Sequence, residues 1–346
     1  MNIYKINSLE YCLNCDDLCI NECPSYNYTK NRYYSPKNIA KTVYNSLKNN
    51  IFDNTELIYA CIHCSKCEEV CPHSTDISEI ALFAKEEMIL HEKVDNYITD
   101  FEENFYKNGD SKYSNFDLKK ILEENSLNRF INDSDTIFIP TSDTLYYSAK
   151  KVEKLYDIFK KLELTPSLHP FKSDSWLSLY YLGYKDEVIT DLKRWLYSLR
   201  DIELIVTPSF KLIHILKRIA VNHKLKVPKV IDIFSYLIQN NFKPNKFSFT
   251  FIGNSFVDKY IFDYKILEKF SDYLFYTTED SRYLINDTIF DLFYNMDKNI
   301  IKEYLNKINK DNIDFIVVPN EETKKLFIKH NNSSIKIITI MDLILK

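Results

Sequence analysis

The sequence predicts an α+β chain of several domains, in which a small α-helical domain is followed by two duplicated α/β units with parallel sheets. Three observations predict this fold class. All eight cysteines lie in two short runs before residue 72, helical hydrophobic spacing separates these runs, and short apolar strands recur about 110 residues apart in the remainder. With 346 residues, 45% of them hydrophobic, the chain can bury a core in each part.

The two cysteine runs share one form, four cysteines ending in Cys-x3-Cys-Pro. The first run is Cys12, Cys15, Cys19 and Cys23 before Pro24, and the second is Cys61, Cys64, Cys67 and Cys71 before Pro72. Three closely spaced thiolates can converge on one centre, while the fourth reaches it from farther along the chain. This form is typical of domains that hold [4Fe–4S] clusters, so the sequence predicts two such clusters.

In two-cluster ferredoxins, the fourth cysteine of each run is a ligand of the other cluster. Applied to this sequence, one cluster is held by Cys12, Cys15, Cys19 and Cys71, and the other by Cys61, Cys64, Cys67 and Cys23. The first run has three residues between Cys15 and Cys19, where two are usual. We expect the extra residue to bulge out of the loop.

Other uses of the cysteines fit this pattern less well. Structural zinc prefers pairs of Cys-x2-Cys separated by a longer segment, disulfides need an oxidising compartment, and buried free thiols would not repeat one spacing twice. Two clusters are favoured, and zinc or a single cluster are the open alternatives. His63 and His73 lie in or beside the second run, and we expect exposed or hydrogen-bonded imidazoles there, not ligands.

The N-terminal domain is predicted to be helical around the two cysteine runs. Helices are predicted to begin at Ser35-Pro36, at Asn54 (covering 56–60) and at Asp76, where Glu79 suggests a capping box. Apolar residues at helical spacing are Ile39, Val43 and Leu47 in the first of these helices, and Ile80, Phe83, Ala84 and Met88 in the last. The predicted ferredoxin-type domain covers residues 1–105.

The rest of the chain is predicted to be a linker, 106–134, and two α/β repeats, 135–243 and 244–346. The stretch 107–114 is polar, which is typical of a linker. The matched segments are 201–208 with 312–319, 230–233 with 340–343, and the opening strands 136–140 with 249–252. Helices are expected at 187–199 and 299–308. Asp232 and Asp342 occupy equivalent positions in this alignment, where both are expected to cap a helix.

Composition excludes several classes of function. The chain has only three glycines, so neither a dinucleotide-binding fingerprint nor a P-loop can be built, and NAD, FAD or ATP chemistry must come from a partner. A net charge of −4 gives no basic surface for nucleic acid. No apolar run approaches the roughly 18 residues of a membrane span. We therefore expect a soluble cytoplasmic protein, which can attach to the cytoplasmic side of a membrane complex.

The N-terminal part resembles the α-helical ferredoxin domain of a family that includes heterodisulfide reductase, the iron–sulfur subunit of glycolate oxidase and anaerobic glycerol-3-phosphate dehydrogenase. The motifs that carry the resemblance are Cys23-Pro24-Ser25-Tyr26, Ser35-Pro36-Lys37, Cys67-Glu68-Glu69-Val70-Cys71-Pro72 and Asp76-Ile77. The C-terminal part is similar to the duplicated cysteine-rich domain of the same proteins.

This second similarity does not extend to the cysteines. The family's repeats carry a Cys-Cys-Gly motif and further cysteines after a strand. The corresponding positions here are 173–176 (Ser-Asp-Ser-Trp), 207–210 (Thr-Pro-Ser-Phe) and 318–321 (Val-Pro-Asn-Glu). The resemblance therefore implies that the fold is kept and the family's extra redox site is lost.

The function predicted from these observations is electron transfer through two [4Fe–4S] clusters, as one component of a multi-subunit oxidoreductase. The expected partners are a flavoprotein dehydrogenase or reductase subunits. The alternatives are a disulfide reductase of the heterodisulfide type, or a structural or assembly protein with non-catalytic clusters. His169, His214 and His223 are scattered and lack a nucleophile at motif spacing, so no catalytic residue is predicted.

Overall fold

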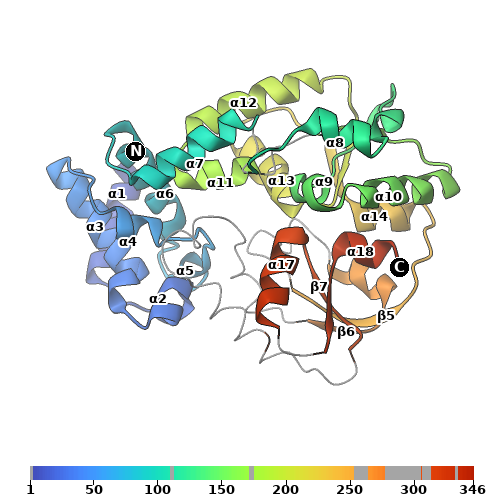
Figure 1. Ribbon diagram of the computed structural model, residues 1–346. Helices are drawn as coiled ribbons and strands as arrows, with labels where there is room; N and C mark the ends of the chain where they lie inside the picture. Colours follow the sequence, from blue (N-terminus) through green and yellow to red (C-terminus); the bar gives the residue numbers. More distant parts are fainter. Residues whose placement is uncertain are drawn as a thin grey trace. The chain divides into compact units, whose positions relative to one another are not determined.

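The computed structural model describes residues 3–109, 113–170, 175–252, 264–276, 305, 313–331 and 334–346. The chain forms two compact units (Figure 1). The first contains the described residues 3–102 and 178–188, and the second contains the described residues of 103–177 and those after 188. Residues 178–188 therefore belong with the helical domain, although they lie inside the predicted first α/β repeat.

The first unit is built from short helices around the cysteine loops. They are α1 (Ile3–Asn14), α2 (Pro24–Thr29), α3 (Pro36–Asn49), α4 (Thr55–Tyr59), α5 (Lys66–Glu69) and α6 (Ile77–Leu90). Helix α1 packs on α3, α4 packs on α6, and α3 and α6 pack on each other. Their buried residues include Ile39, Val43, Ile80 and Met88, so the predicted hydrophobic stripes form the core of this unit.

The predicted helix starts are confirmed. The Ser35 hydroxyl, the Asn54 side-chain carbonyl and the Asp76 carboxylate each accept a hydrogen bond from the backbone N–H three residues on, at 3.3, 3.2 and 2.9 Å. Such bonds satisfy one of the free N–H groups at a helix start. Helices α2 and α5, of six and four residues, were not predicted, because segments this short show no periodicity.

The second unit contains two four-stranded sheets with the same strand order, β2-β1-β3-β4 and β6-β5-β7-β8, and every strand pair is parallel. The strands are β1 (Thr136–Phe138), β2 (Ser167–Leu168), β3 (Leu204–Thr207), β4 (Lys229–Asp232), β5 (Phe247–Phe251), β6 (Ser271–Tyr276), β7 (Phe315–Val318) and β8 (Lys336–Thr339). The predicted α+β fold with duplicated parallel-sheet units is confirmed.

Helices connect these strands and follow them. They are α8 (Leu118–Glu124), α9 (Ser142–Ser148), α10 (Lys150–Lys161), α11 (Trp176–Leu182), α12 (Lys185–Ser198), α13 (Phe210–His214), α14 (Ile233–Gln239), α17 (Glu321–His330) and α18 (Ile340–Ile344). Between the two units, α7 (Asn96–Lys107) carries the chain across the boundary. No helix in the described ranges is long and apolar enough to cross a membrane.

Some details of the predicted repeat differ from the structure. Asp232 is the N-cap of α14, but the N-cap of α18 is Thr339, and Asp342 completes a capping box as the third residue of that helix. The predicted match of Asp232 with Asp342 was therefore wrong by three residues. The predicted linker contains α8, and the predicted helix 299–308 lies outside the described residues, apart from residue 305.

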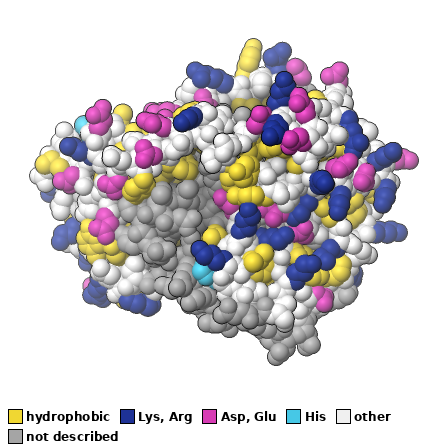
Figure 2. Space-filling model, in the orientation of Figure 1, with side chains coloured by type: hydrophobic (Ala, Val, Ile, Leu, Met, Phe, Trp, Pro, Cys, Tyr) yellow, Lys and Arg dark blue, Asp and Glu magenta, His cyan; other side chains and the backbone are white. Residues whose placement is uncertain are grey.

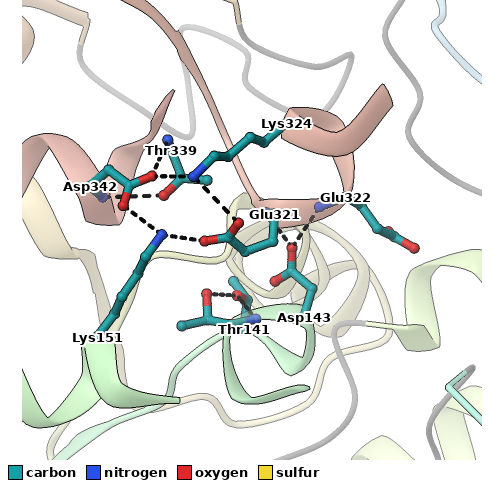
Figure 3. A network of polar contacts seen from close by, with 9 residues as sticks. Thr141, Asp143, Lys151, Glu321, Glu322, Lys324, Thr339 and Asp342 are labelled. Atoms are coloured by element: carbon teal, nitrogen blue, oxygen red, sulfur yellow. Dashed lines mark hydrogen bonds and ion pairs between the residues drawn. The ribbon is translucent and has the colours of Figure 1, made fainter. Parts of the chain in front are cut away.

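A network of buried and half-buried charges joins the two α/β repeats (Figure 3). Lys151 of α10 pairs with Glu321 of α17, and with Asp342 of α18 at 2.6 Å. Lys324 contacts the same two carboxylates, at 2.8 Å from Asp342 and 3.8 Å from Glu321. The Asp143 carboxylate of α9 accepts a hydrogen bond from the backbone N–H of Glu321 at 2.6 Å, so the first repeat also caps a helix of the second.

This network predicts a dependence of stability on pH. Burial alone would raise the pKa of Asp342, but the ammonium groups of Lys151 and Lys324 hold that pKa well below its ordinary value. A carboxyl group whose pKa is lower in the folded state stabilises the fold at pH values above its unfolded pKa of about 3.9. This contribution to stability is lost as the pH falls below that value. We expect Asp342→Asn to lower the free energy of unfolding at neutral pH. At acidic pH, the free energy of unfolding of this variant should decrease less steeply than that of the wild type.

Tryptophan fluorescence during urea denaturation measures this effect, because both tryptophans, Trp176 and Trp195, lie in the second unit. Lys151→Met is the companion variant. It leaves buried carboxylates with one cation fewer and is expected to cost about 3 kcal/mol. An Asp342→Asn protein with the wild-type pH dependence would contradict the prediction.

Candidate metal centre

One cavity of the first unit is lined by Cys12, Cys15, Cys19 and Cys71. Cys12 lies in the last turn of α1, Cys15 and Cys19 follow in the next loop, and Cys71 comes just after α5. Three cysteines of the first run thus share a space with the last cysteine of the second.

A second cavity is lined by Cys23, Cys61, Cys64 and Cys67. Cys23 directly precedes α2, Cys61 and Cys64 lie in the loop after α4, and Cys67 is in α5. The two cavities are neighbours, since Pro36 and Ile77 line both of them. Each cavity gathers three cysteines from one run and one from the other.

The cysteine loops turn sharply without glycine. Asp17 has a φ of 62°, and His63 and Ser65 on either side of Cys64 have φ values of 58° and 55°. This left-handed region is uncommon for residues that carry a Cβ. Asp17 lies in the segment of the first run that is one residue longer than usual, so the extra residue is accommodated by a local left-handed turn.

The electrostatics of the cysteines favour a positively charged group in both cavities. Burial raises the pKa of the Cys12 and Cys61 thiols, and raises that of Cys19, Cys23 and Cys64 to about 12. The pKa of Cys67 is also raised, first by burial and then by the neighbouring thiolates of its own cavity. Buried neighbouring thiolates need cationic compensation, which bound metal ions supply when they displace the thiol protons.

Cys71 differs from the other cysteines. Burial opposes its ionisation, but hydrogen bonds from the backbone of Thr75 and His73 outweigh that effect and lower its pKa. The Thr75 N–H lies 3.4 Å from the Cys71 sulfur. These donors stabilise a thiolate at this position.

A buried lysine contacts the backbone of one cysteine of the second cavity. Lys85 of α6 has a side chain with no exposed surface, and its ammonium group donates to the backbone carbonyl of Cys61 at 3.1 Å. Sequence reasoning missed this residue. Its signal is the helical spacing, because Lys85 comes four residues after Ala81 and three before Met88, which are both buried, and so lies on the core-facing side of the helix.

The two histidines near the second cysteine run lie in different surroundings. His63 is buried, and its Nδ1 is 3.1 Å from the Ser78 carbonyl oxygen. His73 is exposed beside the first cavity and stacks on Tyr11, with ring centroids 4.2 Å apart. The expectation of hydrogen-bonded or exposed imidazoles agrees with both environments.

In the second unit, the positions of the family's missing cysteines carry other structure. Ser209 is the N-cap of α13, and Asn320 and Glu321 form the start of α17, where Glu321 belongs to the charge network. Ser175 and Trp176 are buried, and 173–174 lie outside the described residues. His169, His214 and His223 lie in different segments, and in the described part of the second unit no three His, Cys, Asp or Glu side chains lie close enough together to hold a metal ion.

The second unit also has a wide cavity beside α17, β8 and α18. Five lysines, Asp342 and several isoleucines line it. Two of these lysines, Lys151 and Lys324, are already paired with carboxylates, and Lys346 lies 4.4 Å from the centre of the Phe315 ring. In Figure 2, basic and acidic side chains are interspersed over this face.

Comparison with known proteins bears on the first unit alone. Residues 8–75 match the family model of a 4Fe-4S dicluster domain. This range contains all eight cysteines and both cavities apart from Ile77 and Ser78. No curated protein and no solved structure matches the chain.

The chain thus carries an iron–sulfur domain of the ferredoxin type, and the chemistry of iron–sulfur groups is one-electron transfer. The match covers about a fifth of the chain (68 of 346 residues), so the role of the duplicated α/β unit is a separate question.

Proposed function

We propose that this protein is an electron-transfer subunit of a multi-subunit oxidoreductase and relays electrons through two [4Fe–4S] clusters. Cys12, Cys15, Cys19 and Cys71 hold the first cluster, and Cys61, Cys64, Cys67 and Cys23 hold the second. The observation that supports this best is the pair of adjacent four-cysteine cavities, which share Pro36 and Ile77 as a common wall. Clusters held in these two cavities would be neighbours, as an electron relay requires.

The cavities also favour a cluster over structural zinc. Structural zinc prefers pairs of Cys-x2-Cys separated by a longer segment. Here each cavity gathers three cysteines of one run and the last cysteine of the other, which is the ligand pattern of two-cluster ferredoxins.

The electron donor is proposed to be a flavoprotein dehydrogenase or reductase subunit. The chain has three glycines, Gly109, Gly183 and Gly253, too far apart to build a phosphate-binding loop for a flavin or nicotinamide cofactor. Substrate oxidation therefore belongs to a partner. We place the complex in the cytoplasm, free or attached to the cytoplasmic side of a membrane assembly.

A disulfide reductase activity is the weaker alternative. It requires redox-active cysteines or a further cluster in the second half, and no cysteine follows Cys71 in the sequence. A purely structural role for the clusters makes a different prediction, because such clusters need not accept electrons from a physiological donor.

Anaerobic affinity purification from the native host, with mass spectrometry of stoichiometric companions, is the first test of the proposal. We expect a flavin-containing protein to co-purify, and its substrate to reduce the clusters of the complex within the turnover time. An assembled complex whose clusters stay oxidised while the substrate is consumed would refute the relay and favour a structural role.

A further inference from the structure

We propose that Lys85 holds a buried positive charge beside the second cluster site and raises the reduction potential of that site. Lys85 is not a ligand; it acts on the site through its charge and its hydrogen bond to Cys61. This inference rests on the proposed function, because it concerns the ease with which one of two clusters accepts an electron.

The first observation is the set of groups that surround the Lys85 ammonium group, which we call the cage. Lys85 has no exposed surface, and its Nζ lies 3.1 Å from the Cys61 carbonyl oxygen, 3.2 Å from the Tyr181 carbonyl oxygen and 2.7 Å from Nε2 of His63. It also lies 4.9 Å from the centre of the Tyr59 ring, within the range of a cation–π interaction. Three hydrogen-bond partners and a ring face surround one charged group.

The second observation is the hydrogen-bond pairing of this cage. Nδ1 of His63 lies 3.1 Å from the carbonyl oxygen of Ser78 and 3.0 Å from its hydroxyl oxygen, so a hydrogen on Nδ1 has an acceptor in either group. In that tautomer Nε2 is an acceptor and receives a hydrogen bond from Lys85 at 2.7 Å. A lysine ammonium has three donors and no acceptor, which matches the three acceptors around Nζ.

The third observation is that a late part of the chain closes the cage. The ring of Tyr181 stacks on His63 with centroids 4.5 Å apart, and the Tyr59 hydroxyl donates to the Leu182 carbonyl at 2.8 Å. Gly183 follows with a φ of 110°, and a Cβ at this position would lie 2.8 Å from the backbone carbonyl carbon of Lys85. Residues 178–188 therefore shield Lys85 from water and keep its charge unscreened.

A buried charge of this kind has a predictable effect. Reduction adds one electron, supplied by the flavoprotein donor, to the second cluster. Burial alone disfavours the added negative charge, whereas a positive charge in the same low-dielectric surroundings favours it. The first site has a weaker counterpart, because Lys37 donates to the Cys15 carbonyl at 2.5 Å but is partly exposed, and solvent screens its charge.

The test is a redox titration of the full chain, purified without oxygen and followed by electron paramagnetic resonance, with dithionite as the reductant. Lys85→Met and Lys85→Gln remove the charge, and the glutamine amide keeps a donor within the cage. Lys85→Arg keeps the charge, and Lys37→Met is the matched control at the first site. We expect both neutral variants to bind wild-type amounts of iron and to shift one of the two midpoint potentials downward.

Lys85→Arg is expected to leave both potentials in place, and Lys37→Met to leave the Lys85-dependent potential unchanged. The inference is overturned if neutral variants with full iron content keep both wild-type potentials, or if both potentials move together. Failure of both neutral variants to take up iron at the second site would also overturn it, since Lys85 would then act in assembly. A wild-type chain with full iron that dithionite cannot reduce would instead contradict the proposed function.

Discussion

The Cys23→Ala variant is expected to lose the same iron–sulfur site as Cys64→Ala, although Cys23 belongs to the other cysteine run. The reason is the arrangement of the cavities, in which Cys23 shares its space with Cys61, Cys64 and Cys67. If each cubane contains four iron atoms, either variant should retain about four of the eight iron atoms of the wild type. Iron analysis and the number of redox transitions measure this loss.

Double variants test the assignment directly. The iron losses of two variants add when the cysteines belong to independent sites, and they do not add when both are ligands of one site. Cys23→Ala combined with Cys64→Ala should lose no more iron than either single change. Cys23→Ala combined with Cys15→Ala should lose nearly all of it. The reciprocal pair, Cys71→Ala with Cys15→Ala, should again behave as one site. If Cys23→Ala with Cys15→Ala behaved as a single loss, each site would be formed within one run.

Gly183→Ala is expected to destabilise the first unit by about 2–5 kcal/mol. The added methyl group would lie 2.8 Å from the Lys85 carbonyl carbon and 2.9 Å from the side chain of Ile89, at a backbone φ of 110°. Overpacking and a left-handed residue with a Cβ each cost roughly 1–3 kcal/mol. Thermal unfolding followed by loss of the visible absorption of the clusters measures this change.

Gly109→Ala is the matched control for this substitution. Gly109 also has a positive φ, of 63°, so the control measures the backbone cost at a second site with the same residue change. We expect its effect to be about 1 kcal/mol. Because Gly109 lies in the second unit, tryptophan fluorescence during urea denaturation measures this effect. Equal losses in the two variants would show that the close approach of residue 183 to α6 contributes nothing.

Much of the fold was predictable because its signals are local. The N-caps Ser35, Asn54 and Asp76 each mark a helix start in three or four residues of sequence. The β-strands were predictable for a different reason, since strands of a parallel sheet buried on both faces are short, continuous apolar runs. The repeat register near Asp342 was wrong because Ile340-Met341-Asp342-Leu343 has the same apolar pattern as a strand but forms a helix.

The candidate site was predictable only as far as the cysteine spacing extends. Nothing in the sequence connects Tyr181 with His63, because the stacking of their rings depends on a segment that lies more than a hundred residues farther along the chain. The charge network around Lys151 was missed for the same reason, since its pairs with Glu321 and Asp342 join the two repeats. Side-chain contacts between distant segments are set by tertiary packing and have no local signature.

The exchange of one cysteine between the two runs has a consequence for biosynthesis. Neither run can enclose a complete site alone, since the first cavity needs Cys71 and the second needs Cys23. A nascent chain can therefore accept neither cluster in full until the second run has left the ribosome. Both sites then become available almost together, so neither cluster can be completed while the first run alone is outside the ribosome.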